Sequence, residues 1–196
     1  MRRLFAALVL AVGLSALPAW SQVNEVPRFD ISGGFSHVTG DIGLNGWQLG
    51  AAYRVNNWLA IAGDFAGQYG SNDIVAITGT SLIKVDRSLY NYMFGPRVFV
   101  PLAGHPRWMP FGEFLLGASR GKDTLKSTLL GSVVIPGTET SDSSFSWQLG
   151  GGLDYQFHEN FRVRAVQLGL LHTNFFDNGE THLRIGAGLV YQFGGR

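Results

Sequence analysis

The sequence predicts an all-β fold, an eight-stranded antiparallel up-and-down transmembrane β-barrel preceded by a signal peptide. Two patterns favour this fold class: apolar and polar residues alternate with period two in eight segments, and the connections between segments alternate between long and short. After the N-terminal segment, no apolar stretch approaches the roughly 20 residues of a membrane helix. A membrane-spanning chain of this kind must close into a barrel, because lipid offers no water to an open sheet edge.

The N-terminal segment has the three parts of a secretory signal peptide. A basic start, Met1-Arg2-Arg3, is followed by an apolar run over residues 4–16 and by small residues that include Ala19 and Ser21. We expect cleavage after Ser21, which divides the chain into a signal peptide (1–21) and a barrel domain (22–196). Cleavage lowers the formal net charge from +1 to −1, and such a near-neutral chain with scattered basic residues predicts no nucleic-acid partner.

Cysteine is absent from the sequence. This excludes a disulfide framework, a thiolate metal site and a cysteine-linked lipid anchor. No motif calls for a cofactor, and none is expected.

The first three strands alternate cleanly. Aromatic and aliphatic residues such as Phe29, Trp47 and Phe65 fall on one face, and Asp30 and Arg54 fall on the other. The eight predicted strands cover residues 28–37, 46–55, 58–69, 89–100, 108–120, 144–157, 161–173 and 182–193.

Irregularities are expected in the middle and late strands. Pro96 lacks a backbone donor, so the ladder should be interrupted near it. The alternation in the fifth strand places Phe111 and Leu115 inward among polar residues. In the seventh strand, Arg164 and Gln167 both face inward only if the parity changes near Ala165, which predicts a β-bulge there.

The last strand has the clearest alternation. Its apolar face carries Leu183, Ile185, Ala187, Leu189, Tyr191 and Phe193, and its other face carries His182, Arg184, Gly186, Gly188, Val190 and Gln192. An unbroken apolar face that ends in aromatic residues is typical of a strand facing lipid outside and a polar lumen inside. Residues 150–157 nearly repeat residues 186–193, which indicates a hairpin-scale unit used more than once.

The connections give the barrel an orientation. Short turns lie at one rim and longer loops at the other, as in outer-membrane barrels, so both termini belong to the periplasmic rim. Aromatic residues form two expected interface belts. The periplasmic belt contains Tyr53, Trp58, Trp108, Tyr155, Phe161, Tyr191 and Phe193, and the other contains Trp47, Tyr69, Tyr90 and Phe145.

Over residues 28–193 the sequence resembles the OmpA-type, porin-family eight-stranded outer-membrane β-barrel. The resemblance lies in Tyr92-Met93-Phe94-Gly95-Pro96-Arg97, Arg164-Ala165-Val166-Gln167 and Tyr191-Gln192-Phe193. It implies a Gram-negative outer-membrane location and a C-terminal assembly signal for the barrel-assembly machinery at Gly188, Tyr191 and Phe193. The sequence departs from the family pattern by continuing through Gly194-Gly195-Arg196, and we do not expect the peptidoglycan-binding domain that full-length members carry.

Charged residues on the inward faces form a predicted lumen network. Its nine members are Asp30, Arg54, Asp64, Arg97, Glu113, Asp154, Arg162, Arg164 and Arg184. Near-balanced signs favour paired ions that fill a narrow interior, because eight strands enclose little more than their own side chains. The alternative is a gated ion path.

The five histidines, His37, His105, His158, His172 and His182, share no zinc-ligand spacing. Outer-membrane lipid A deacylases combine His, Ser and a carboxylate near a strand end. His172-Thr173 with Glu180 departs from that pattern in spacing and in its hydroxyl residue. We therefore expect no enzyme, no metal site and no catalytic residue.

The two longest connections, residues 70–88 and 121–143, are the expected recognition surface. Alternating residues flank Thr78-Gly79-Thr80, which indicates a hairpin that continues beyond the membrane, and residues 129–135 form an apolar loop segment. Projecting strands could offer an edge to a surface protein or host ligand, or could simply be extended barrel strands.

The sequence thus predicts a monomeric outer-membrane barrel in contact with lipid, with a structural or surface-interaction role. A narrow porin-like pore is the first alternative, and a lipid-modifying enzyme is the second. A soluble lipocalin-like barrel is the rival fold, and it would turn the apolar faces inward.

Overall fold

The computed structural model describes residues 27–40, 43–75, 82–125, 128–130, 133–135, 138–175 and 178–194. The predicted signal peptide lies outside these residues. Within the described ranges, no helix is both long and apolar enough to cross a membrane.

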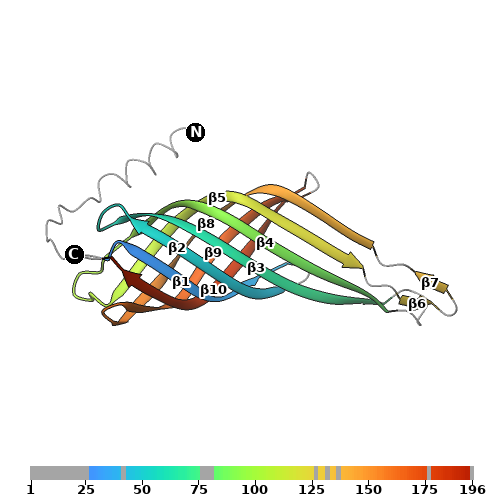
Figure 1. The fold of residues 1–196 in the computed structure, drawn as a ribbon, viewed down its shortest axis with the longest axis horizontal. Helices are drawn as coiled ribbons and strands as arrows, with labels where there is room; N and C mark the ends of the chain where they lie inside the picture. Colours follow the sequence, from blue (N-terminus) through green and yellow to red (C-terminus); the bar gives the residue numbers. More distant parts are fainter. Residues whose placement is uncertain are drawn as a thin grey trace, which may run out of the picture.

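Eight strands close into one barrel in the order β1-β10-β9-β8-β5-β4-β3-β2, and every neighbouring pair is antiparallel (Figure 1). This confirms the predicted fold class. The barrel strands are β1 (Phe29–Val38), β2 (Leu44–Arg54), β3 (Leu59–Val75), β4 (Leu82–Phe99), β5 (Trp108–Leu125), β8 (Thr138–His158), β9 (Phe161–Phe175) and β10 (Asn178–Phe193). Two further short strands, β6 (Thr128–Leu130) and β7 (Val133–Ile135), pair only with each other.

The faces of the strands point as the alternation predicts. On β10, Leu189 is 55% exposed, whereas Val190 and Gln192 are fully buried in the lumen. Large apolar side chains of all eight barrel strands are exposed on the outside, while most buried side chains are polar or charged. A lipocalin-like barrel requires the opposite arrangement, so that rival is wrong.

Glycines allow the first and last strands to approach closely where the barrel closes. A Cβ on Gly34 of β1 would meet the backbone of Ala187 and Gly188 on β10. Gly188 has the reciprocal environment, because its Cβ would meet the backbone of Gly33 and Gly34. Any larger residue at these two positions would force β1 and β10 apart.

The predicted bulge at Ala165 is confirmed. On the β8 side the register shifts between Leu153↔Val166 and Asp154↔Arg164, and a matching shift occurs opposite β10. Ala165 and Val166 are both exposed on the outside. The extra residue lets Arg164 and Gln167 point into the lumen from the same strand.

The other irregularities are milder. Pairing between β4 and β5 skips Gly95 and Pro96 and resumes in the same register at Arg97, so Pro96 interrupts the ladder without a bulge. Phe111 and Leu115 are buried in the lumen, as the alternation requires.

The strands are longer than predicted at the end away from the termini. Residues 70–75 and 82–88 continue β3 and β4, and their pairing confirms the hairpin predicted on either side of Thr78-Gly79-Thr80, three residues that lie outside the described ranges. Residues 121–125 and most of 138–145 were expected in a loop, but they continue β5 and β8. The reason is continued pairing, with Val75 opposite Leu82 and Leu125 opposite Thr138. β9 and β10 likewise extend to Phe175 and back to Asn178.

These four extensions form what we call the projecting sheet. Pairing of β2 with β3 ends at Asn45↔Tyr69, and pairing of β8 with β9 begins at Ser146↔Thr173. Beyond those pairs, β3 and β8 are the outer strands of the projecting sheet (Figure 1). The β6–β7 hairpin, which was expected as an apolar loop, lies beyond the ends of β5 and β8.

Candidate functional site

The barrel interior holds all nine charged residues assigned to it from the sequence. Each is at most 7% exposed. They come from every barrel strand: Asp30 on β1, Arg54 on β2, Asp64 on β3, Arg97 on β4, Glu113 on β5, Asp154 on β8, Arg162 and Arg164 on β9, and Arg184 on β10.

Eight of the nine form four ion pairs. The nitrogen-to-oxygen distances are 3.1 Å for Arg54–Asp30, 2.6 Å for Arg97–Glu113, 2.9 Å for Arg164–Asp154 and 2.6 Å for Arg184–Asp64. A buried ion with no partner costs several kcal/mol, so each pair removes a large penalty. The ninth residue, Arg162, has no such pair among the described residues.

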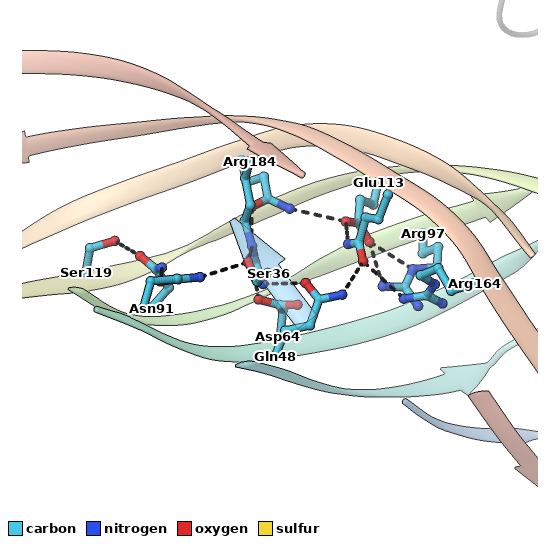
Figure 2. Close-up of polar contacts among 12 residues, drawn as sticks. Ser36, Gln48, Asp64, Asn91, Arg97, Glu113, Ser119, Arg164 and Arg184 are labelled. Atoms are coloured by element: carbon cyan, nitrogen blue, oxygen red, sulfur yellow. Dashed lines mark hydrogen bonds and ion pairs between the residues drawn. The ribbon is translucent and has the colours of Figure 1, made fainter. Parts of the chain in front are cut away.

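Arg184 lies at the centre of the network. Its Nη1 donates to Asp64 and Gln148, its Nη2 donates to Gln48, and its Nε donates to Ser36 (Figure 2). All four acceptors are buried. The single guanidinium therefore joins strands β1, β2, β3 and β8 to β10 across the lumen.

Glu113 forms a second centre. Its Oε2 accepts from Nε and Nη2 of Arg97, and its Oε1 accepts from Gln148 and Gln167. Gln148 also accepts a hydrogen bond from Arg184, so the two centres are joined.

A row of uncharged polar side chains extends the network toward the projecting sheet. Ser119 donates to Asn91, Asn91 donates to Gln68, and Gln68 donates to Ser36. Figure 2 shows the resulting path from Ser119, through Ser36 and Arg184, to Glu113 and Arg97. The charged network was predicted, but this amide and hydroxyl row was missed, although the inward parity of Gln68, Asn91 and Ser119 could have revealed it.

At the end of the barrel with the short turns, which we call the short-turn end, aromatic and sulfur groups cover the charges. The guanidinium carbon of Arg54 lies 3.9 Å from the ring centre of Phe99. Phe111 contacts both Arg97 and Arg164 in the same manner, at 4.8 and 4.5 Å. The sulfur of Met109 lies against Arg54 and Arg162.

The histidines do not assemble a catalytic group. His172 points outward, stacks on Trp147 and lies 2.9 Å from the Thr181 hydroxyl, whereas Thr173 is buried on the opposite face of the strand. Glu180 pairs with His182 instead, at 3.2 Å. No group of three metal-ligating residues occurs in the part of the chain that the structure describes.

The projecting sheet carries its own ion pairs. Arg87 makes a bidentate pair with Asp123 at 2.8 and 2.9 Å, and Lys122 pairs with Glu139 at 2.9 Å. These side chains are half exposed, so the ion pairs contribute little to stability and serve mainly to align neighbouring strands.

The residues assigned to the C-terminal assembly signal lie at the seam of the barrel. Tyr191 packs on Phe161 and Phe193, and Phe193 stacks on Phe29 of β1 at 5.4 Å. All these rings face outward at the short-turn end.

A family model described as the outer membrane protein beta-barrel domain matches residues 5–193 of the sequence. The chain belongs to this family. A search of curated proteins found no significant match.

Solved outer-membrane barrels share the fold. The attachment invasion locus protein Ail of Yersinia pestis, solved with the heparin analogue sucrose octasulfate, is 24% identical, with coverage of 83% of this chain and 96% of Ail and a TM-score of 0.51. Neisserial surface protein A is 14% identical, with coverage of 85% and 97% and a TM-score of 0.52.

Family membership fixes the location and direction of the barrel. The protein resides in the bacterial outer membrane, where the apolar outer faces contact lipid. In such barrels short turns face the periplasm and longer hairpins face outward. The short-turn end is therefore periplasmic, and the projecting sheet is extracellular.

Proposed function

We propose that this outer-membrane barrel protein is a surface-interaction module whose membrane part is a closed scaffold, with neither pore nor catalytic activity. The observation that carries the proposal is the contrast between the two ends of the same strands. The lumen is crossed by a bonded network centred on Arg184 and Glu113, while β3, β4, β5 and β8 continue as an open-edged sheet.

The edge of β8 is the best candidate contact. Residues 138–145 pair with β5, whereas the pairing of β8 with β9 begins only at Ser146. Eight residues of strand extend over about 26 Å, which is long enough for a partner strand to add through backbone hydrogen bonds. The partner class that fits is an extended segment of a surface or host protein.

A sulfated polysaccharide fits less well. Ail was solved with a heparin analogue, but the projecting sheet of this chain contains five acidic and three basic residues. A polyanion would therefore meet net negative charge. The acidic residues are Asp73, Asp86, Asp123, Glu139 and Asp142, and the basic residues are Lys84, Arg87 and Lys122.

Two shortened variants test the proposal. Asn-Gly in place of residues 72–85 would connect the paired residues Ser71 and Asp86, and Asn-Gly in place of residues 124–139 would connect Asp123 and Thr140. Each replacement keeps the Arg87–Asp123 pair and the membrane strands. Folding would be checked by the difference in gel mobility between boiled and unboiled protein.

The assay is attachment of a non-adherent Gram-negative host, expressing each variant, to epithelial monolayers. Wild-type protein should promote attachment, and the variant without residues 124–139, which loses the outer end of the β8 edge but keeps residues 140–145, should attach more weakly. Equal attachment by wild-type and both shortened proteins would refute the proposal. Steady single-channel conductance of the wild-type barrel in planar bilayers would favour the pore instead.

Assembly and oligomeric state complete the proposal. We propose that the protein is a monomer and that Gly188, Tyr191 and Phe193 present the last strand to the barrel-assembly machinery. The outward aromatic cluster around Tyr191 and Phe193 supports this, because it lies on the strand that closes the barrel.

A further inference from the structure

The lumen network carries one positive charge more than it can pair. Five arginines and four carboxylates belong to it, and the four carboxylates are each bonded to another arginine. Arg162 is the unmatched cation, although it is only 3% exposed. Among the described residues, the only hydrogen-bond contact of its side chain is from Nη1 to the sulfur of Met109, at 3.2 Å.

The carboxylates nearest to Arg162 along the short-turn end are already engaged. Asp30 accepts from Arg54 through Oδ2 and from Gln192 through Oδ1. Both oxygens of Asp154 accept from Arg164. A charge partner for Arg162 must therefore come from outside this set.

Arg54 and Arg162 converge on the same sulfur atom. Nη1 and Nη2 of Arg54 both lie 3.8 Å from the Met109 sulfur, and Nη1 of Arg162 lies 3.2 Å from the same atom. The Nε atoms of both arginines are buried and make no hydrogen bond to a described residue. Two like charges thus face one neutral thioether, which is a weak acceptor.

We propose that the short-turn end of the lumen binds one small monovalent inorganic anion of the chloride class between Arg54 and Arg162. The anion would lie where the two guanidinium groups converge, and the Met109 side chain would move aside. Methionine is unbranched and has three rotatable bonds, so this movement needs no change in the strands. One monovalent anion brings the charge of the network to zero, which a divalent phosphate or sulfate would not do.

Binding is tested on the folded protein in detergent micelles at constant ionic strength. The line width of ³⁵Cl NMR reports chloride exchange with the protein. Thermal unfolding in chloride is compared with unfolding in gluconate, a much larger monovalent anion. Chloride at ten times its Kd should raise the unfolding temperature by about 4 °C. The excess line width should disappear when bromide competes.

Two variants separate the site from a general salt effect. Arg162→Gln removes the surplus cation and should abolish both the excess line width and the chloride shift. Met109→Glu supplies the anion covalently, so this variant should unfold at a higher temperature than wild type in gluconate and should not respond to chloride. The matched control is Met93→Glu, which places a carboxylate opposite Asp64 in the same lumen and should lower the unfolding temperature.

Three results would overturn the proposal. The first is an equal unfolding temperature in chloride and gluconate, and the second is a Met109→Glu variant destabilised as much as Met93→Glu. The third is stabilisation by sulfate or phosphate without stabilisation by chloride. If Arg162→Gln fails to fold, the Met109→Glu comparison decides the question alone.

Discussion

Replacing Arg184 with methionine tests how much the lumen network contributes to stability. The change removes the partner of Asp64, whose side chain is only 5% exposed, and removes one donor each from Ser36, Gln48 and Gln148. An uncompensated buried carboxylate alone costs about 3–5 kcal/mol. The free energy of unfolding of Arg184→Met should therefore fall by about 4 kcal/mol.

The assay is equilibrium urea unfolding of the lipid-reconstituted barrel, followed by tryptophan fluorescence. Arg120→Met is the matched control, because Arg120 occupies an exposed position on the outside of β5. That change should alter the free energy of unfolding by no more than about 0.5 kcal/mol.

The double variant Arg184→Met with Asp64→Asn separates charge from packing. Neutralising Asp64 removes the stranded carboxylate, so the double variant should recover at least half of the lost stability. Loss of less than about 1 kcal/mol in the single variant, or a double variant no more stable than the single one, would refute the assignment of the penalty to Asp64.

Three further predictions concern the backbone and the C-terminal strand. Deletion of Ala165 should prevent formation of the compact band that folded, unboiled protein gives on a gel. Without the bulge, the faces of residues 161–164 would be reversed, and Arg162 and Arg164 would point to lipid. The control variant Ala165→Ser should fold normally. Gly117→Ala should lower the free energy of unfolding by about 2 kcal/mol, because its Cβ would meet the carbonyl oxygen of Tyr92. Gly63→Ala is the control and should be tolerated, because the atom nearest to its Cβ lies 3.8 Å away. Phe193→Ala should reduce the amount of folded protein in isolated outer membranes, with Phe157→Ala as the control; equal amounts would argue against an assembly role.

The membrane part of the fold could be predicted because its two environments differ so strongly. Lipid accepts apolar side chains on one face, and the narrow lumen accepts polar or small ones on the other, so period two is visible in every strand. The bulge followed from the same rule, since Arg164 and Gln167 could face the lumen together only after a change of parity at Ala165.

Three features could not be predicted. Pairing of Arg184 with Asp64 joins β10 to β3 across the lumen, and period two fixes faces but not which residues meet at one height. The structure was also needed to show that Arg162 is the arginine left without a carboxylate, because this required assigning each carboxylate to its own arginine. The hairpin of β3 and β4 was predicted to continue beyond the membrane, but β8 was predicted too short, because both faces of residues 138–144 are polar and give no alternation.

The strands of the projecting sheet come from the middle of the chain, whereas β1 and β10 at its two ends close the barrel. The extracellular hairpins and the closing seam can therefore change independently of each other during evolution. Paired insertions or deletions at the tips of β3–β4 and β5–β8 change the height and edge of the extracellular part, and they leave the closing seam untouched. Such a protein can diversify its contacts through hairpin length, while its lipid-facing segments remain under constant selection for period two.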